Sequence, residues 1–145
     1  MALTHDFLTI NSNEIKNLLD LNKMYFSNSD IRYTKDDHIP WPKDHEDADD
    51  ILLEYYKRHR NACISIHDDF IRPKIDCFEK IDTLYGGFIP FRGLNYYGFT
   101  LIPTESISLF TSVLKKIQIK SEYNLLIKSC YKSLTTKNYI LHCGV

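Results

Sequence analysis

The chain has 145 residues, of which 43% are hydrophobic, 26% charged and 13% aromatic. This composition excludes a disordered or low-complexity protein, and no apolar run approaches the ~20 residues that a membrane-spanning helix needs. The net charge is only −1, yet residues 1–69 hold 8 basic and 14 acidic side chains, while residues 70–145 hold 10 basic and 5 acidic ones. The asymmetry suits an oriented encounter with a charged partner, although charges fall unevenly in many small proteins.

The first predicted elements are a strand over residues 3–10 and a helix over residues 12–26. Asn11 and Glu14 form the Asn-x-x-Glu pattern of a capping box, whose two side chains satisfy free backbone donors of the first helical turn. Apolar side chains then recur at the three- and four-residue spacing of one helix face.

Residues 27–46 are predicted to form a polar loop, which Pro40 and Pro42 stiffen. Loops near 20 residues are uncommon and mark either a binding surface or an undetected element. Residues 36–50 hold seven acidic side chains against one lysine, with the only tryptophan, Trp41, between the two prolines. An acidic loop with an aromatic anchor suits a basic partner. We therefore expect the partner-binding residues to be Asp36, Asp37, Trp41, Asp44, Glu46 and Asp47.

A second helix is predicted to begin with Asp47 as its cap and to run to about residue 62. Asp49 and Asp50 lie near its positive end, and basic side chains lie near its negative end. Both placements agree with the helix dipole. Part of the acidity therefore has a structural explanation, and a merely solvated loop is the simplest alternative to a binding surface.

The middle of the chain changes from helical to strand-like character. Residues 63–72 fit a strand or a helix, whereas residues 73–85 are predicted to be a helix because Pro73 suits a first turn and apolar residues recur every three or four positions. Residues 94–102 are aromatic and β-branched and predict a strand, in which Gly98 indicates a bulge or a close backbone approach.

The C-terminal third predicts two helices and a closing strand. One helix follows Pro103, a second begins near Ser121, and the strand covers residues 138–143. The whole chain, residues 1–145, is therefore expected to be a single α+β domain with a small, mostly antiparallel sheet and four to five helices packed on it.

The four cysteines are scattered and form no Cys-x-x-Cys pair. No signal peptide is expected, because His5 and Asp6 interrupt any early apolar run. Reduced thiols and a cytoplasmic location are therefore expected.

Each group of side chains that could bind a metal or catalyse a reaction has a simpler explanation. His38, Asp44, His45 and Asp47 could ligate a metal, but their spacing matches no known signature, so we expect neither a metal nor a cofactor. His67 beside Asp68 and Asp69, and Glu79 three residues before Asp82, could supply acid–base chemistry, but helix-surface charge explains them equally well, so no catalytic residue is assigned. His142 and Cys143 would point to opposite faces of a strand.

Two alternative functions remain open at this point. A small metal-dependent hydrolase would use His38, His45 and neighbouring carboxylates. A nucleic-acid-binding module would use the lysines of the C-terminal half with Tyr123 and Tyr131, because phosphates and bases bind such side chains. The slightly acidic chain and the dipole-stabilising position of those lysines argue against nucleic acid as the partner.

The last part of the chain carries a pattern in three pieces: Gly86-Gly87-Phe88, then the run from Gly93 to Pro103, then the closing run from Tyr139 to Val145 after amphipathic helices. This pattern resembles small bacterial immunity proteins of polymorphic-toxin and contact-dependent growth-inhibition systems. The resemblance implies an antitoxin-like inhibitor without chemistry of its own, which binds a cognate toxin domain inside the producing cell. Such toxin domains are often nucleases, which are commonly basic. The resemblance carries over no contact residue.

Overall fold

A computed structural model of the chain describes residues 3–14, 45–85, 89–117 and 121–145. In these parts the chain forms one six-stranded sheet with all neighbouring strands antiparallel, in the order β2-β1-β6-β5-β3-β4. The strands are β1 (Thr4–Asn11), β2 (Ile64–His67), β3 (Asp82–Tyr85), β4 (Ile89–Arg92), β5 (Phe99–Ile102) and β6 (Asn138–Cys143). Helices pack on this sheet, so the predicted α+β class is confirmed.

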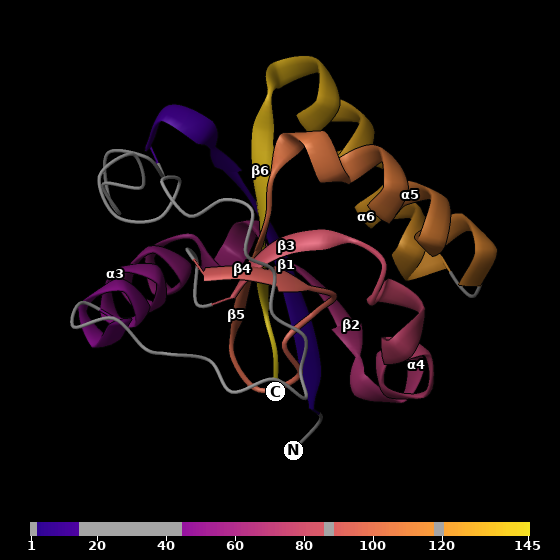
Figure 1. Cartoon of the computed structure of the whole chain (residues 1–145), viewed down its shortest axis with the longest axis horizontal. Helices are drawn as coiled ribbons and strands as arrows, with labels where there is room; N and C mark the ends of the chain where they lie inside the picture. Colours follow the sequence, from indigo (N-terminus) through magenta and orange to yellow (C-terminus); the bar gives the residue numbers. More distant parts are fainter. Residues whose placement is uncertain (1–2, 15–44, 86–88, 118–120) are drawn as a thin grey trace.

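The described helices lie on both sides of the sheet (Figure 1). They are α3 (His45–Arg58), η2 (Arg60–Ala62), α4 (Asp68–Ile71), η3 (Arg72–Phe78), α5 (Thr104–Ile117) and α6 (Ser121–Thr136), where η marks a 3-10 helix. Successive side chains of a strand point to opposite faces, so Phe7 of β1 faces α5 and α6 while Asp6 faces α3. None of these helices is long and apolar enough to cross a membrane.

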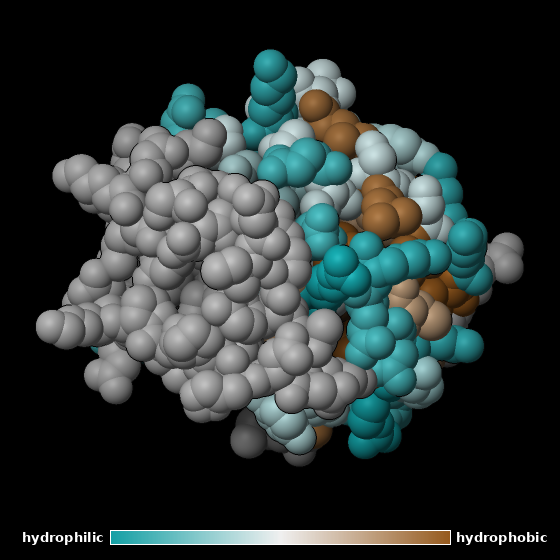
Figure 2. Space-filling model, viewed as in Figure 1, coloured by the Kyte–Doolittle hydropathy of each residue, from teal (hydrophilic) through white to brown (hydrophobic). Residues whose placement is uncertain are grey.

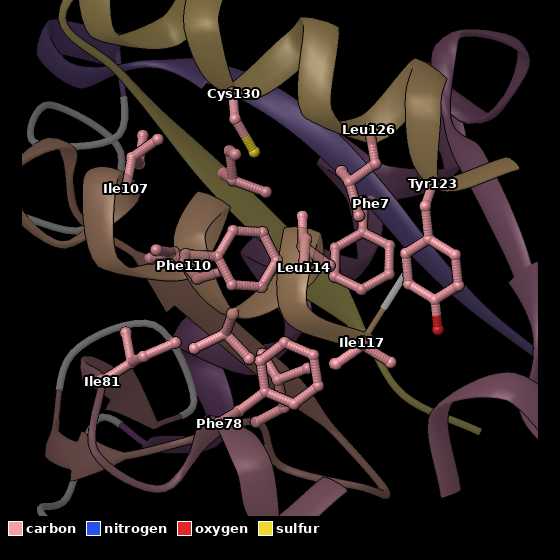
Figure 3. Close-up of a cluster of buried hydrophobic side chains, with 14 of the residues drawn as sticks. Phe7, Phe78, Ile81, Ile107, Phe110, Leu114, Ile117, Tyr123, Leu126 and Cys130 are labelled. Atoms are coloured by element: carbon pink, nitrogen blue, oxygen red, sulfur yellow. The ribbon is translucent and has the colours of Figure 1, made fainter. Parts of the chain in front are cut away.

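The main core lies between the sheet and the α5–α6 pair. Figure 3 shows the side chains of these two helices meeting Phe7 from β1 and Phe78 from η3. Phe110 and Leu114 of α5 are fully buried there, beside Leu126 of α6. Each such side chain contributes roughly 1.5–3 kcal/mol of burial free energy. Each of these two helices therefore packs an apolar face against the sheet.

Most predicted elements are present with small shifts in their ends. The first strand, the two C-terminal helices and the closing strand 138–143 are confirmed. Asn11 caps a helical turn as predicted, since its Oδ1 accepts from the backbone N–H groups of Asn13 and Glu14 at 2.9 and 3.2 Å. The rest of the helix 12–26 and most of the loop 27–46 lie outside the described residues. The next helix begins at His45, two residues before the predicted cap.

Two predictions in the middle of the chain are wrong. Residues 73–85 are not one helix, because η3 ends at Phe78 and residues 82–85 become β3, which pairs with both β4 and β5. The strand predicted over residues 94–102 is shorter, since only Phe99–Ile102 pair with β6. A strand with neighbours on both edges gains hydrogen bonds along each edge, and these outweigh the local helical periodicity of residues 82–85. Residues 63–72 contain both alternatives, β2 followed by α4.

Candidate functional site

The acidic segment predicted to bind a partner is not part of the described structure. Asp36, Asp37, Trp41 and Asp44 lie outside the described residues, as does the suggested metal ligand His38. Glu46 and Asp47 belong to the first turn of α3, and nothing is described of their side chains. The partner-binding assignment of these six residues therefore stays a prediction.

The described structure presents a different surface feature, a short loop between β4 and β5. We call residues 93–98 the tyrosine loop. Tyr97 is 79% exposed and is the most exposed large apolar side chain among the described residues. Its ring stands edge-on to that of Tyr96, with centroids 4.7 Å apart and planes at 81°. Where Figure 2 shows described residues, the surface is mainly hydrophilic, with apolar side chains in a few patches.

Backbone and side-chain hydrogen bonds hold the tyrosine loop at both ends and from its side. The bonds are Gly93 N–H to the Ile81 carbonyl (2.9 Å), Asn95 N–H to Thr100 Oγ1 (2.7 Å), Tyr97 N–H to Asn95 Oδ1 (3.2 Å), Gly144 N–H to the Gly98 carbonyl (2.9 Å) and Val145 N–H to the Tyr96 carbonyl (2.9 Å). The last two come from the residues that follow β6. The C-terminal residues therefore fix the loop that carries the exposed tyrosine.

Two glycines are required by this arrangement. Gly93 has a φ of +83°, a left-handed conformation that side chains rarely adopt. Gly144 passes so close to the loop that a Cβ there would lie 2.1 Å from the Tyr96 carbonyl oxygen. Both positions therefore need a residue without a side chain.

A line of buried polar side chains runs beneath the tyrosine loop across three strands. We call it the histidine ladder: Thr100 of β5, His142 of β6, His5 of β1 and Asp68 of α4. His142 Nε2 lies 2.9 Å from His5 Nδ1, and His5 Nε2 lies 3.0 Å from an Asp68 carboxylate oxygen. Thr100 Oγ1 lies 3.4 Å from His142 Nδ1. The two imidazole rings are stacked, with centroids 5.2 Å apart and planes at 11°.

The ladder has a consistent hydrogen-bond direction when both rings are neutral. His5 then donates from Nε2 to Asp68 and accepts at Nδ1 from His142, which in turn accepts at its own Nδ1 from the Thr100 hydroxyl. Both histidines are 0% exposed. Burial lowers the pKa of His5, and burial together with the nearby His5 lowers the pKa of His142 well below the ordinary 6.5.

Asp68 joins the ladder to the tyrosine loop. The Tyr96 hydroxyl donates to the Asp68 carboxylate at 2.7 Å, and the Arg72 guanidinium lies 3.8 Å from it. Burial raises the pKa of Asp68, but the hydrogen bonds from Tyr96 and His5 outweigh this effect and leave it below the ordinary value. The buried aspartate therefore stays ionised and holds the Tyr96 ring in place.

A surface hollow of about 280 Å³ opens beside the loop, between it and η3. We call it the acidic hollow. Its lining consists of apolar Ile75, Phe91 and Leu94, aromatic Tyr96 and Tyr97, acidic Asp76 and Glu79, and Arg92, Gly93 and Asn95. The Arg92 guanidinium lies 3.7 Å from the carboxylate of Asp82, outside the lining.

The residues considered for acid–base chemistry do not come together as one group. Asp68 turns into the core toward His5, whereas His67 lies 3.5 Å from the exposed Asp69 carboxylate. Glu79 and Asp82 do not share a helix face, because a turn ends at residue 80 and β3 begins at Asp82. Within the described ranges, no group of three or more histidine, cysteine or carboxylate side chains could hold a metal ion.

The cysteine thiols and the C-terminal lysines are the remaining candidate groups. All four cysteines are free, and burial raises the pKa of Cys63, Cys130 and Cys143 to about 11 in each case. His142 and Cys143 point to opposite faces of the sheet, as predicted, since they lie opposite Phe7 and Asp6 of β1. In the described part of the suggested nucleic-acid surface, Lys115 Nζ lies 4.8 Å from the ring centre of Tyr131.

The sequence reading missed the tyrosine loop and the histidine ladder. Gly93 and Gly98 flank four residues, which is a loop signal, but the aromatic residues between them favour a strand by composition. His5, Asp68 and His142 are far apart in the chain, and they come together because β1 pairs with both β6 and β2. No protein-family model, curated protein or solved structure matches this chain.

Proposed function

We propose that this protein is an immunity protein, which binds and neutralises a cognate toxin domain in the cytoplasm of the producing cell. The single observation that supports a binding role most directly is Tyr97, a 79% exposed aromatic side chain on a loop held by several hydrogen bonds and a buried ladder. The proposal assigns the protein no reaction of its own.

A rigid loop with an exposed tyrosine is an efficient binding element. Tyrosine offers a large contact area at a low cost in conformational entropy, and it is frequent among the residues that dominate protein interfaces. A loop already fixed before binding loses little further freedom when a partner engages it. The hydrogen bonds from Gly144 and Val145 supply that rigidity here.

The charge pattern favours a basic partner. The sequence places seven acidic side chains in residues 36–50, and the acidic hollow adds Asp76 and Glu79 beside Tyr97. Negative surfaces accelerate association with a positively charged protein, and a toxin that holds nucleic-acid phosphates is positively charged. We therefore propose a basic nuclease domain as the partner, with Asp36, Asp37, Trp41, Asp44, Glu46 and Asp47 at the interface.

The test uses the variable C-terminal domain of any exported protein encoded immediately upstream. Calorimetry should show that Trp41→Ala combined with Asp44→Lys and Glu46→Lys weakens binding by about 3 kcal/mol or more, over 100-fold in Kd, because an aromatic anchor and two attractive charges are lost. Tyr131→Ala, an exposed aromatic on α6, is the control and should leave Kd unchanged. Equal affinity of the triple variant and the natural chain would remove the acidic segment from the interface.

A further inference from the structure

We propose that the outer face of α5 and α6 binds single-stranded nucleic acid. The two helices lie side by side on the side of the sheet that Phe7 faces (Figure 1). We call their exposed basic surface the lysine face: Lys115, Lys116, Lys128, Tyr131, Lys132 and Lys137. The inference goes beyond the proposed function and does not depend on it, because none of these residues is assigned to the toxin interface.

The lysine face carries positive charge that few nearby acids balance. Residues 104–137, which contain both helices, hold six lysines against Glu105 and Glu122. Glu105 lies in the first turn of α5, at the opposite end of that helix from Lys115 and Lys116. Among the described residues, none of the five lysines of the face forms an ion pair with a carboxylate. The net charge of −1 for the whole chain therefore does not describe this surface.

The helix dipole explains only part of this charge. Lys115 and Lys116 lie in the last turn of α5, where the dipole stabilises cations, but the last turn of α6 holds no basic residue. Lys128 and Lys132 lie inside α6, four residues apart on one side of the helix, where like charges repel each other. A bound anion relieves that repulsion, so these two lysines favour an anionic partner.

Tyr131 places an aromatic ring among the lysines. It is 47% exposed, and its hydroxyl accepts a hydrogen bond from Lys115, whose Nζ lies 4.8 Å from the ring centre. Lys128 precedes Tyr131 by three residues and therefore lies on the same side of α6. Proteins bind single strands with this combination, in which cations contact phosphates and an aromatic ring stacks on a base. A membrane surface offers phosphates without bases, and a duplex keeps its bases stacked on one another.

The test is fluorescence anisotropy of a labelled oligothymidine of about 20 nucleotides, titrated with the full-length protein alone. At about 50 mM salt the Kd should be on the order of 10–100 µM, and log Kd should rise with log salt with a slope of about 2–3, as expected for about four phosphate contacts. A duplex of the same length should bind more weakly. Absence of binding, a slope near zero, or tighter binding of the duplex would overturn the proposal.

A pair of double variants locates the phosphate contacts. Lys128→Gln combined with Lys132→Gln should raise the Kd about tenfold and lower the salt slope by about 1.4, because two contacts are lost. Lys57→Gln combined with Arg58→Gln is the matched control, since it removes the same charge from exposed positions of α3 and should leave both quantities unchanged. An equal loss in the two double variants would show a response to net charge alone and contradict the assignment.

Variants of Tyr131 test the stacking contact. Tyr131→Ala should raise the Kd about fivefold or more with the salt slope nearly unchanged, because a stacked base is lost and the phosphate contacts remain. Tyr131→Phe retains the ring and should bind as the natural chain does. Vesicles containing phosphatidylserine and soluble polyglutamate are the competing anions, and both should displace the oligothymidine poorly. Efficient displacement by either one, or full affinity of Tyr131→Ala, would reject single-stranded nucleic acid as the partner.

Discussion

His5 and His142 show how single residues in the core support a surface loop. Both rings are fully buried, which lowers the pKa of each, and together with Asp68 they form a continuous hydrogen-bonded line that ends at the hydroxyl of Tyr96. Neither ring reaches solvent, and the contacts of His5 lead through Asp68 to the Tyr96 hydroxyl of the tyrosine loop. Polar groups buried in this way stabilise a structure only while every partner is present.

The ladder predicts a pH dependence of stability. The pKa of each buried histidine is lowered in the folded protein, so the unfolded chain binds more protons once the pH falls below about 6.5, and acid therefore destabilises the fold. Between pH 7 and pH 5 the free energy of unfolding should fall by about 2 kcal/mol for each histidine that stays neutral. Asp68 does not contribute to this loss of stability between pH 7 and pH 5, because its stabilising contribution is lost only near or below its ordinary pKa of 3.8.

Urea denaturation at several pH values measures this effect. His142→Gln should flatten the dependence, because it removes the histidine whose pKa is lowered most, and the slope with pH is readable even in a less stable variant. A free energy of unfolding that stays constant from pH 7 to pH 5 in the natural chain would contradict two neutral buried histidines.

At the scale of elements, two contacts link distant segments to the proposed binding residues. Asp6 of β1 accepts hydrogen bonds from Ser65 Oγ at 2.6 Å and from the hydroxyl of Tyr56 in α3. This contact fixes to the sheet the helix whose first turn contains Glu46 and Asp47. The second contact joins the chain after β6 to the tyrosine loop through Gly144.

The second contact predicts the effect of Gly144→Ala. The added Cβ would lie 2.1 Å from the Tyr96 carbonyl oxygen, so the loop or the C-terminal residues must move apart. Overpacking of this kind costs about 1–3 kcal/mol, which thermal or urea denaturation detects. Ser112→Ala at an exposed position of α5 is the control and should change stability by less than about 0.5 kcal/mol. A Gly144→Ala protein as stable as the control would show that the contact is loose.

At the scale of the whole molecule, the sequence predicts the class of fold better than the location of the described site. Amphipathic periodicity is strong in α5 and α6, and β1 and β6 carry clear strand character, so these elements were predicted nearly to the residue. Residues 82–85 instead form a strand through pairing with β4 and with the more distant β5, and the helical periodicity of residues 73–85 reveals neither pairing.

The described site was hidden for a related reason. The ladder combines residues separated by up to 137 positions, as in the contact between His5 and His142, and the hollow combines residues 75–79 with residues 91–97. Tyr97 was predicted in a strand, where one of every two side chains is often buried, and its exposure depends on the turn made by residues 93–98. The acidic segment, by contrast, was visible from composition alone, and its role stays a prediction.

The proposed function has the partner contact the acidic segment and the tyrosine loop, and hydrogen exchange of the complex with the toxin domain tests this claim most directly. We predict that the partner slows backbone exchange in residues 36–47 and in the tyrosine loop, 93–98, while the exposed face of α5 and α6 exchanges as in the free protein. Protection confined to α5 and α6, around Lys115 and Tyr131, with residues 36–47 and 93–98 unaffected, would contradict the account.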